Sequence, residues 1–301
     1  MLEPGRALRM PGLLMNNPPD DIIDKEFVDR DPQKKTYKEM ISSLLAPRIL
    51  CIEAQDGLGK TWLLKRFSKD STKPGWYRAE IDLGKWGVDN ARDLLELIAK
   101  EMGGEIQKEM ARANISGKSG VNITAGRDVN IKGDLVVGPK VMVNTPGGTE
   151  HLSVQLVDPD YTQHVIALVE NFKTSLQKLK PMQWAILFLD NYEQSTKETK
   201  QWLTDVLLPG VKSGEYNHLI IVITSTSGFE YFEQREWRNV VVKHKLEGLP
   251  EVSFREYWLK RRHLPKEHMS TTLIILKAEG MSPKVMSRYA DMIEDAVKGK
   301  V

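Results

Sequence analysis

The chain has 301 residues, of which 41% are hydrophobic and 28% are charged, and its formal net charge is +2. This length is enough to bury a full core in one large domain or two modest ones. The positive charge is spread without a dominant basic block, which gives no support to nucleic-acid binding. The apolar runs are too short to span a bilayer, and the single cysteine, Cys51, lies in an apolar strand pattern. We therefore expect a cytoplasmic protein without a membrane span or a disulfide, with Cys51 in the core.

The first part of the chain changes from an irregular segment to a regular alternation. Residues 1–24 are rich in Pro, Asn and Asp and have no periodic pattern, so we expect a flexible tail. Apolar spacing then predicts a helix from Tyr37 to Leu45, a strand at Ile49–Glu53, a strand at Trp76–Leu83 and an amphipathic helix at Asn90–Met102. This order of strands and helices is typical of a parallel sheet.

The segment after the first predicted strand has the pattern of a phosphate-binding loop. Residues 54–61 have the sequence A-Q-D-G-L-G-K-T, which matches the P-loop pattern except that Ala54 replaces its first Gly. In such a loop, backbone N–H groups and the positive end of the next helix surround phosphate oxygens. We expect Lys60 to bridge the terminal phosphates and the Thr61 hydroxyl to hold Mg²⁺. Trp62 and Phe67, in the helix that follows, are expected to face the core.

The alternation breaks over residues 112–158. This segment mixes β-branched residues with Gly, Asn and Asp, and Val121-Asn122-Ile123 recurs as Val129-Asn130-Ile131. The pattern predicts a β-rich insertion in the form of a hairpin, a meander or a few rungs of a small solenoid. Such an insertion is either a tolerated surface excursion or a surface for oligomerisation or a partner, and the sequence does not separate the two.

A second buried strand ends in an acidic residue. Trp184–Leu189 is an uninterrupted apolar run, as expected of a strand covered on both faces, and Asp190 follows it directly. Open α/β sheets place ligand chemistry at the carboxyl ends of their strands. We therefore expect Asp190 to bind Mg²⁺, directly or through water, beside Thr61. The alternative is that Asp190 only caps the next element.

The last third of the chain continues the sheet and then becomes helical. Ser195–Glu198 has the form of a capping box and starts a helix that Pro209-Gly210 is expected to end. Leu219–Thr224 is another buried strand pattern, and Asn239–Val242 predicts a further strand. From Pro250 onward the apolar spacing is helical.

These elements predict an α/β fold of the P-loop NTPase type. Residues 25–248 are expected to form a three-layer sandwich around a mainly parallel sheet, with the β-rich segment inserted in it. Residues 249–301 are expected to form a C-terminal helical lid.

Several segments are similar to the motifs of one known class of proteins. They are Phe27-Val28-Asp29-Arg30, the loop at 54–61, Leu189-Asp190-Asn191-Tyr192-Glu193, Leu246-Glu247-Gly248-Leu249-Pro250 and Glu279-Gly280-Met281-Ser282-Pro283. In order, they resemble an opening F-V-G-R-E motif, the Walker A loop, the L-D-N-x-E form of Walker B, the L-x-x-L start of a lid and the G-x-P turn of that lid. The chain thus resembles the STAND class of P-loop ATPases, the signalling switches that include the NACHT and NB-ARC modules.

The resemblance implies a set of site residues. The opening motif would help to seat adenine, and the lid proline would pack near the base. The nucleotide-binding set would be Phe27, Val28, Arg30, Gly57, Leu58, Gly59, Lys60, Thr61, Trp62 and Pro283. Lys60, Asp190 and Glu193 would be catalytic, with Glu193 orienting the attacking water, and Thr61 and Asp190 would hold Mg²⁺.

The chain also departs from the class pattern. Asp29 and Asp31 replace the usual Gly and Glu of the opening motif, Thr226 stands where many members have a phosphate-sensing arginine, and Asn191 stands where relatives have a second acid. A missing guanidinium leaves transition-state charge less well stabilised. These departures favour slow or absent turnover.

The function that the resemblance implies is a switch that binds ATP or ADP with Mg²⁺ and hydrolyses ATP slowly. It would act in signalling, regulation or defence, by a route that includes nucleotide-controlled oligomerisation. Its partner would be a second copy or another protein, contacted through the β-rich insertion or the lid.

Two other functions stay open. One is a non-catalytic scaffold in which bound nucleotide is structural. The other is a P-loop kinase acting on small molecules, which would need a lid with phosphate-clamping arginines. The sequence offers only Arg261-Arg262-His263 for that clamp, and a solvated helix end explains this cluster more simply.

Overall fold

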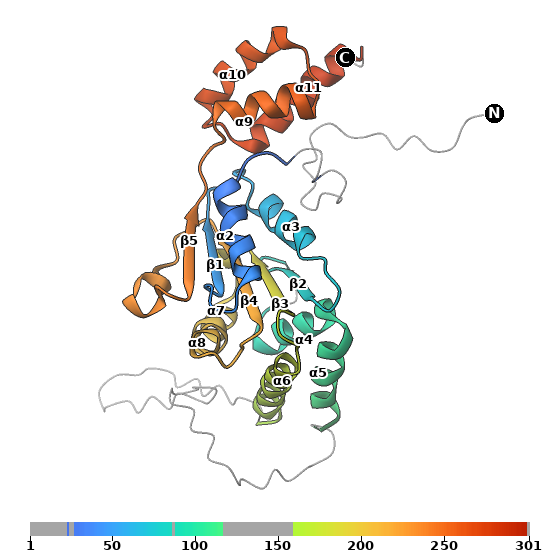
Figure 1. The fold of residues 1–301 in the computed structure, drawn as a ribbon, viewed down its shortest axis with the longest axis vertical. Helices are drawn as coiled ribbons and strands as arrows, with labels where there is room; N and C mark the ends of the chain where they lie inside the picture. Colours follow the sequence, from blue (N-terminus) through green and yellow to red (C-terminus); the bar gives the residue numbers. More distant parts are fainter. Residues whose placement is uncertain (1–22, 24–26, 86–87, 117–158, 300–301) are drawn as a thin grey trace, which may run out of the picture.

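The computed structural model describes residue 23 and residues 27–85, 88–116 and 159–299 (Figure 1). Most of the predicted tail and of the predicted β-rich insertion lie outside the described residues. The predicted start of the insertion at residue 112 is wrong, because residues 112–116 are the end of helix α5 (Gly104–Ser116). That helix is held by Ile106 and Met110, which are buried in the core.

A five-stranded parallel sheet forms the centre of the molecule. Its strands are β1 (Ile49–Glu53), β2 (Tyr77–Asp82), β3 (Ala185–Asp190), β4 (Leu219–Ser225) and β5 (Val241–Lys245), in the order β2-β3-β4-β1-β5. Every residue of β3 and β4 is buried, as the uninterrupted apolar runs predict. All four neighbouring pairs are parallel, so the carboxyl ends of the strands meet at one edge of the sheet.

Helices cover both faces of the sheet. They are α2 (Asp31–Ser42), α3 (Lys60–Asp70), α4 (Ala91–Met102), α5, α6 (Pro159–Gln177), α7 (Lys197–Trp202) and α8 (Leu208–Ser213). The two faces follow the alternation of side chains along the strands. In β3, Leu187 and Leu189 belong to the hydrophobic cluster shared with α4 to α8, whereas Ile186 and Phe188 belong to the cluster shared with α2 and α3. Together they form the predicted three layers.

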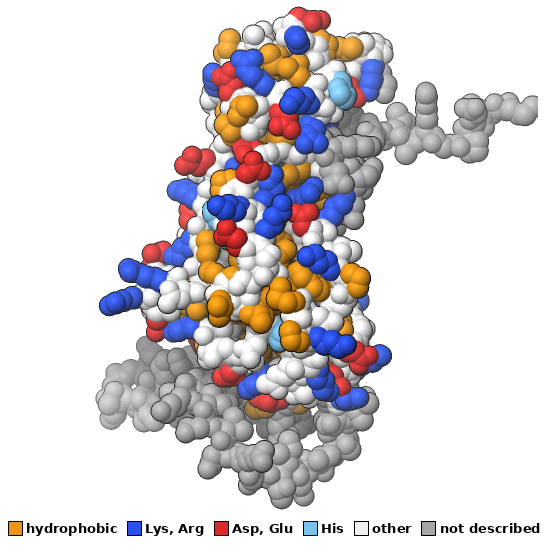
Figure 2. Space-filling view, in the orientation of Figure 1, with side chains coloured by type: hydrophobic (Ala, Val, Ile, Leu, Met, Phe, Trp, Pro, Cys, Tyr) orange, Lys and Arg blue, Asp and Glu red, His pale blue; other side chains and the backbone are white. Residues whose placement is uncertain are grey.

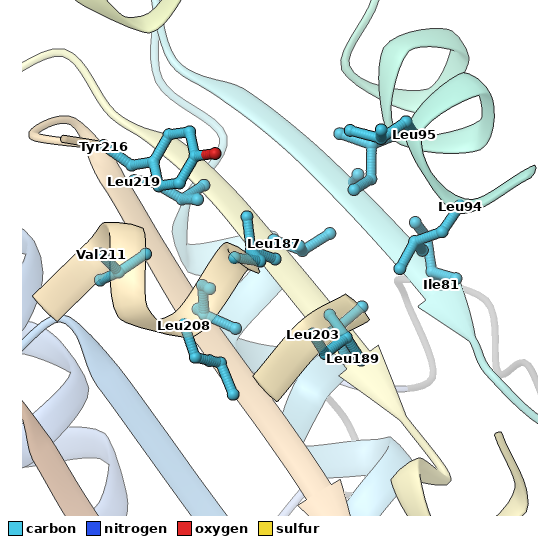
Figure 3. Close-up of a cluster of buried hydrophobic side chains, with 14 of the residues drawn as sticks. Ile81, Leu94, Leu95, Leu187, Leu189, Leu203, Leu208, Val211, Tyr216 and Leu219 are labelled. Carbon is cyan, nitrogen blue, oxygen red and sulfur yellow. The ribbon is translucent and has the colours of Figure 1, made fainter. Parts of the chain in front are cut away.

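Figure 3 shows how the larger of these clusters is built. Leu187 and Leu189 of β3 lie beside Leu203, Leu208 and residues of the neighbouring helices, and Ile81 of β2 lies beneath Leu94 and Leu95 of α4. Cys51 is fully buried in the same cluster, as predicted. Burial raises the pKa of its thiol well above the ordinary value, and nearby Lys243 opposes this only in part.

The C-terminal helices form a separate small cluster at one end of the molecule (Figure 1). They are α9 (Glu251–Glu256), continued by a π-helical turn at Tyr257–Arg261, α10 (Met269–Ala278) and α11 (Pro283–Val297). Their core contains Leu249, Phe254, Tyr257, Trp258, Leu264, Leu273, Leu276, Met286 and Ala290, joined by Val28 from the N-terminal segment. We call these C-terminal helices the lid.

One predicted helix end is wrong. The helix that begins at Lys197 is capped by Thr196, whose side chain accepts a hydrogen bond from the Thr199 backbone, and it does not end at Pro209-Gly210. It passes through a π-helical turn at Leu203–Leu207 and continues to Ser213. Pro209 occupies the first turn of α8, where its missing N–H costs little, and Gly210 allows the Tyr216 ring to pack against the backbone.

Acidic and basic side chains are intermixed over the face shown in Figure 2. This agrees with the absence of a basic block in the sequence. Among the described residues, no helix is both long and apolar enough to cross a membrane.

Candidate functional site

The loop between β1 and α3 has the backbone conformation that its glycines suggest. Gly57 has φ 82° and Gly59 has φ 93°, in the left-handed region that glycine adopts without steric cost. The Ala54 backbone N–H donates to the Ser225 carbonyl at 3.0 Å, and its methyl group is buried. Ala54 therefore extends the hydrogen bonding between β1 and β4.

Lys60 is a buried cation at the start of α3. It is 6% exposed, and its Nζ donates to the Ala54 carbonyl at 2.7 Å. Asp56 Oδ1 is 3.4 Å from the same Nζ, but the Asp56 side chain is 92% exposed, so this ion pair is screened by water. A buried ammonium group next to the positive end of a helix is suited to an anion such as phosphate.

Thr61 and Asp190 meet although they are 129 positions apart in the chain. The Thr61 hydroxyl donates to Asp190 Oδ2 at 2.6 Å, and the Thr224 hydroxyl donates to Oδ1 of the same carboxylate. A hydroxyl and a carboxylate are oxygen ligands of the kind that Mg²⁺ prefers. Among the described residues, no group of three or more His, Cys, Asp or Glu side chains is placed to hold a metal. A magnesium ion at Thr61 and Asp190 would therefore share its coordination with phosphate oxygens and water.

Asn191 connects Asp190 to the neighbouring strand. Its backbone has φ 57° and ψ 46°, and its N–H donates to Asp190 Oδ1 at 3.1 Å. Its side-chain amide donates to Asp82 Oδ1 at 2.8 Å. The residue that replaces the second acid of the class pattern is thus hydrogen-bonded to an acid on β2.

Glu193 lies in the short helical turn after β3 and is bound to the end of β4. Its Oε2 accepts the Thr226 backbone N–H at 3.1 Å. Burial acts to raise the pKa of this carboxyl, but it is outweighed by hydrogen bonds from its own backbone, from Thr226 and from the Ser225 hydroxyl, and the pKa is lowered. The carboxylate form of Glu193 is therefore favoured, and it holds β3 and β4 together.

The N-terminal segment lies between the loop and the lid. Phe27 packs with Leu58 on the cluster beside α3, Val28 is buried in the lid core, and the Arg30 guanidinium donates to the Leu58 carbonyl at 2.9 Å. Burial lowers the pKa of Arg30, and nearby Asp29 partly opposes this. Asp29 has φ 65°, a conformation that glycine adopts freely and Asp more readily than most residues. This explains how Asp stands where the class pattern has Gly.

The start of α11 contacts the loop directly. The Ser282 hydroxyl donates to the Gly57 carbonyl at 3.0 Å, and the Lys284 backbone N–H donates to the same oxygen at 3.3 Å. A Cβ placed on Gly59 would lie 3.8 Å from Pro283 Cγ. The lid proline predicted to lie near the nucleotide is therefore next to the predicted phosphate loop.

Trp62 is placed differently from the prediction. Leu63, Leu64 and Phe67 are buried in the core, whereas Trp62 is only partly buried and lies outside the core clusters. The helical spacing after Lys60 therefore assigned Trp62 to the wrong face of α3.

The arginines considered for a phosphate clamp are engaged within the lid. Arg262 binds Asp291 and lies 2.8 Å from Glu294 Oε2, and Arg261 lies 3.3 Å from Glu256 Oε1. These ion pairs support the structural explanation of the cluster.

Two residues of the site were missed in the sequence. Thr224 shares the Asp190 carboxylate, and Asp82 binds Asn191. Both stand at or next to the carboxyl end of a strand, the position that singled out Asp190. Strand-end position alone was the available signal, since neither residue belongs to a motif.

No family model and no curated protein matches the chain. Among solved structures, Cdc6p from Pyrobaculum aerophilum is similar with a TM-score of 0.51 and 12% identity, over 91% of this chain and 66% of that one. ORC1 from Aeropyrum pernix, solved in complex with DNA, has a TM-score of 0.45 and 14% identity, over 93% of this chain and 63% of that one. A STAND protein with a tetratricopeptide repeat sensor from Pyrococcus horikoshii has a TM-score of 0.44 and 14% identity, over 85% of this chain and 28% of that one.

The chain spans less than two thirds of each of these three proteins. Of these three, the likeness to Cdc6p has the highest TM-score, and at 12% identity it concerns the fold alone. The parallel sheet order and the C-terminal helices agree with it. The chain is therefore similar in fold to Cdc6p from Pyrobaculum aerophilum, at low sequence identity.

Proposed function

We propose that this chain binds ATP or ADP with Mg²⁺ at the loop between β1 and α3 and acts as a nucleotide-controlled switch with slow ATP hydrolysis. One observation carries the proposal: the loop that presents Lys60 and Thr61 is also the loop to which the lid is hydrogen-bonded, at the Gly57 carbonyl. A ligand bound at this loop would contact both the sheet and the lid.

The residues present fit a magnesium nucleotide. Lys60 would neutralise phosphate oxygens, and the N–H groups at the start of α3 would donate to them. Thr61 and Asp190 would hold Mg²⁺, whose charge would draw electrons from the terminal phosphate. Phe27, Val28, Arg30 and Pro283 lie around the loop, where they would border the base.

A switch follows from differential contacts. A ligand shifts a conformational equilibrium only by the difference in its affinity for the two states. Loss of the terminal phosphate would remove contacts at Lys60 and at the Mg²⁺ site while leaving those around the base. The arrangement of lid and sheet would then depend on which nucleotide is bound.

The end of β4 supports slow turnover. Thr226 stands where many STAND members have an arginine; its N–H donates to Glu193, and the nearby Thr224 hydroxyl donates to Asp190. A neutral hydroxyl stabilises developing phosphate charge less than a guanidinium does. Glu193 was expected to orient the attacking water, but its Oε2 is already bound to the Thr226 N–H.

Calorimetry with Mg²⁺ and ATP or ADP tests the proposal. Lys60→Ala is expected to abolish measurable binding because it removes the buried cation. Lys38→Ala changes the same residue type at an exposed position of α2 and is expected to bind like the natural chain. Unchanged affinity in Lys60→Ala would overturn the proposal.

The proposed partners are tested separately. The mass of the particle is measured in solution with ADP, with a non-hydrolysable ATP analogue and without nucleotide. A mass that depends on the nucleotide supports assembly controlled by the switch. Retained ADP with no phosphate release and no change of mass would favour the scaffold function instead.

A further inference from the structure

We infer that Asp82, at the end of β2, is the carboxylate that orients the attacking water in ATP hydrolysis, and that Asn191 positions it. This inference rests on the proposed function. Asp82 lies outside every motif of the sequence. In this proposal Asp82, not Glu193, orients the attacking water.

The strand register brings Asp82 to the site. β2 and β3 are parallel neighbours, and Asp82 is paired with Asp190 across them. Neighbouring strands lie about 4.8 Å apart, and paired residues of parallel strands point to the same side of the sheet. The Leu83 backbone N–H also donates to the Asp190 carbonyl at 3.0 Å, so the pairing continues past the end of β2. Asp82 is therefore fixed one strand away from the residue proposed to hold Mg²⁺.

The two oxygens of Asp82 have different surroundings. Oδ1 accepts the Asn191 amide at 2.8 Å and the Gly84 backbone N–H at 3.1 Å. Oδ2 has Lys85 Nζ at 3.7 Å, beyond hydrogen-bond distance, and the Lys85 side chain is 68% exposed. One oxygen thus anchors the carboxylate, while the other keeps acceptor capacity for a water molecule.

Asn191 explains why the acid is on β2. Its N–H binds Asp190 Oδ1 and its amide binds Asp82 Oδ1, so a single residue sets the position of both carboxylates. A carboxylate at position 191 would meet Asp82 at hydrogen-bond distance, and two like charges so close would repel. Asn191 and Asp82 are therefore compatible neighbours. The second carboxylate of the site lies at the end of β2, as Asp82, rather than after β3 at position 191.

Glu193 is less suited to the role. Its Oε2 already accepts the Thr226 backbone N–H at 3.1 Å. Turning this oxygen toward a water molecule would break that bond, whereas Asp82 would keep both hydrogen bonds of Oδ1 while Oδ2 binds the water.

The reaction step is ordinary ATP hydrolysis. The water oxygen forms a bond to the γ-phosphorus while the bond from that phosphorus to the β–γ bridging oxygen breaks, and ADP leaves with the electron pair of the broken bond. One water proton stays on the product as HPO₄²⁻ and the other is released to solvent. Asp82 Oδ2 accepts a hydrogen bond from the water and aims its lone pair at phosphorus.

The test measures phosphate release and mant-ATP affinity, both with Mg²⁺, on the full chain. The variants are Asp82→Asn, Asp82→Glu, Asn191→Ala and Glu193→Gln. Asp89→Asn is the matched control, because Asp89 follows the same strand but is exposed, and among the described residues its hydrogen bonds are made by its backbone rather than its carboxylate. Asp82→Asn is expected to lower kcat about 100-fold, the usual scale for such a group, with the mant-ATP Kd within about threefold.

The other variants separate positioning from folding. Asp82→Glu keeps a carboxylate and is expected to recover part of the lost kcat. Asn191→Ala is expected to lower kcat with an unchanged Kd for mant-ATP. If Asp82→Asn does not fold, this variant still tests whether the Asn191 amide positions Asp82. Glu193→Gln is expected to reduce kcat less than Asp82→Asn does.

Three results would overturn the inference. They are a kcat for Asp82→Asn within threefold of Asp89→Asn, a loss of mant-ATP binding in Asp82→Asn, and binding without any turnover in the natural chain. Failure of the natural chain to bind mant-ATP would instead overturn the proposed function itself.

Discussion

The Ser282 hydroxyl donates a hydrogen bond to the Gly57 carbonyl at 3.0 Å, across 225 positions of the chain. Gly57 belongs to the proposed phosphate loop and Ser282 to the turn that starts α11. The Lys284 N–H reaches the same carbonyl. Any change in the loop backbone that turns this oxygen would therefore alter a contact of the lid.

Ser282→Ala should weaken the junction between loop and lid without destroying it. The variant loses one partly buried hydrogen bond, worth about 1 kcal/mol, while the Lys284 N–H still reaches Gly57. We expect a lower melting temperature and a changed ratio of ATP to ADP affinity. Ser287→Ala, on the same helix, is the control. Equal affinity ratios in the two variants would show that the junction does not sense nucleotide.

Gly248→Ala should disturb the path from β5 into the lid. A Cβ at Gly248 would lie 2.0 Å from the Gly280 carbonyl oxygen, a backbone atom that cannot move aside cheaply. We expect destabilisation of about 1–3 kcal/mol in denaturant unfolding. Gly228→Ala is the control, since its Cβ would make only an ordinary 3.5 Å contact with Glu53. If Gly248→Ala is as stable as Gly228→Ala, the close approach of Gly248 to the Gly280 carbonyl is contradicted.

Asp190→Asn should remove the magnesium dependence of nucleotide affinity. The amide keeps one acceptor for Thr61 or Thr224 but loses the negative charge that a divalent cation needs. Titration with ADP in the presence and absence of Mg²⁺ measures the effect, with Asp89→Asn as the control. An unchanged magnesium dependence would mean that Asp190 only caps the following turn.

His244 should make stability fall in acid. Burial lowers the pKa of its imidazole below the ordinary value, and its Nε2 lies 2.9 Å from the Thr36 hydroxyl. Because the folded pKa is the lower one, the neutral form contributes stability above the unfolded pKa of about 6.5, and this is lost as the pH falls toward the folded pKa. His244→Gln should flatten the melting temperature between pH 7.5 and pH 5.

The control for that titration is His268→Gln, an exposed residue of the lid. It should keep the natural slope of melting temperature with pH. If His244→Gln also keeps that slope, another group is responsible for the acid sensitivity.

The sequence predicts the sheet well because its strands are continuous apolar runs. β1, β3 and β4 lie within one or two residues of their predicted bounds. The last strand is shifted, from the predicted Asn239–Val242 to Val241–Lys245, because an edge strand alternates polar and apolar residues and its period is easily misplaced. The first helix stops at Ser42, which leaves Leu45 96% exposed.

The site was predictable where a motif spans it. Lys60, Thr61 and Asp190 follow from strand ends and loop pattern, and the structure brings them together. Strand-end position alone did not reveal the roles of Asp82 and Thr224, since these roles depend on which strands are neighbours and on register. The continuation of the helix past Pro209 depends on the π-helical turn at Leu203–Leu207, which no motif in the sequence marks.

The distance between lid and sheet, measured as a function of the bound nucleotide, tests the proposed switch directly. Spin labels are placed at Lys38→Cys on α2 and Ile274→Cys on α10, where Ile274 is 71% exposed, while buried Cys51 stays unlabelled. Electron–electron double resonance then gives the distance distribution with Mg²⁺ and either ADP or a non-hydrolysable ATP analogue. We predict distributions that differ between the two nucleotides and become identical when Lys60→Ala is added. Identical distributions in the protein with Lys60 intact would contradict the account.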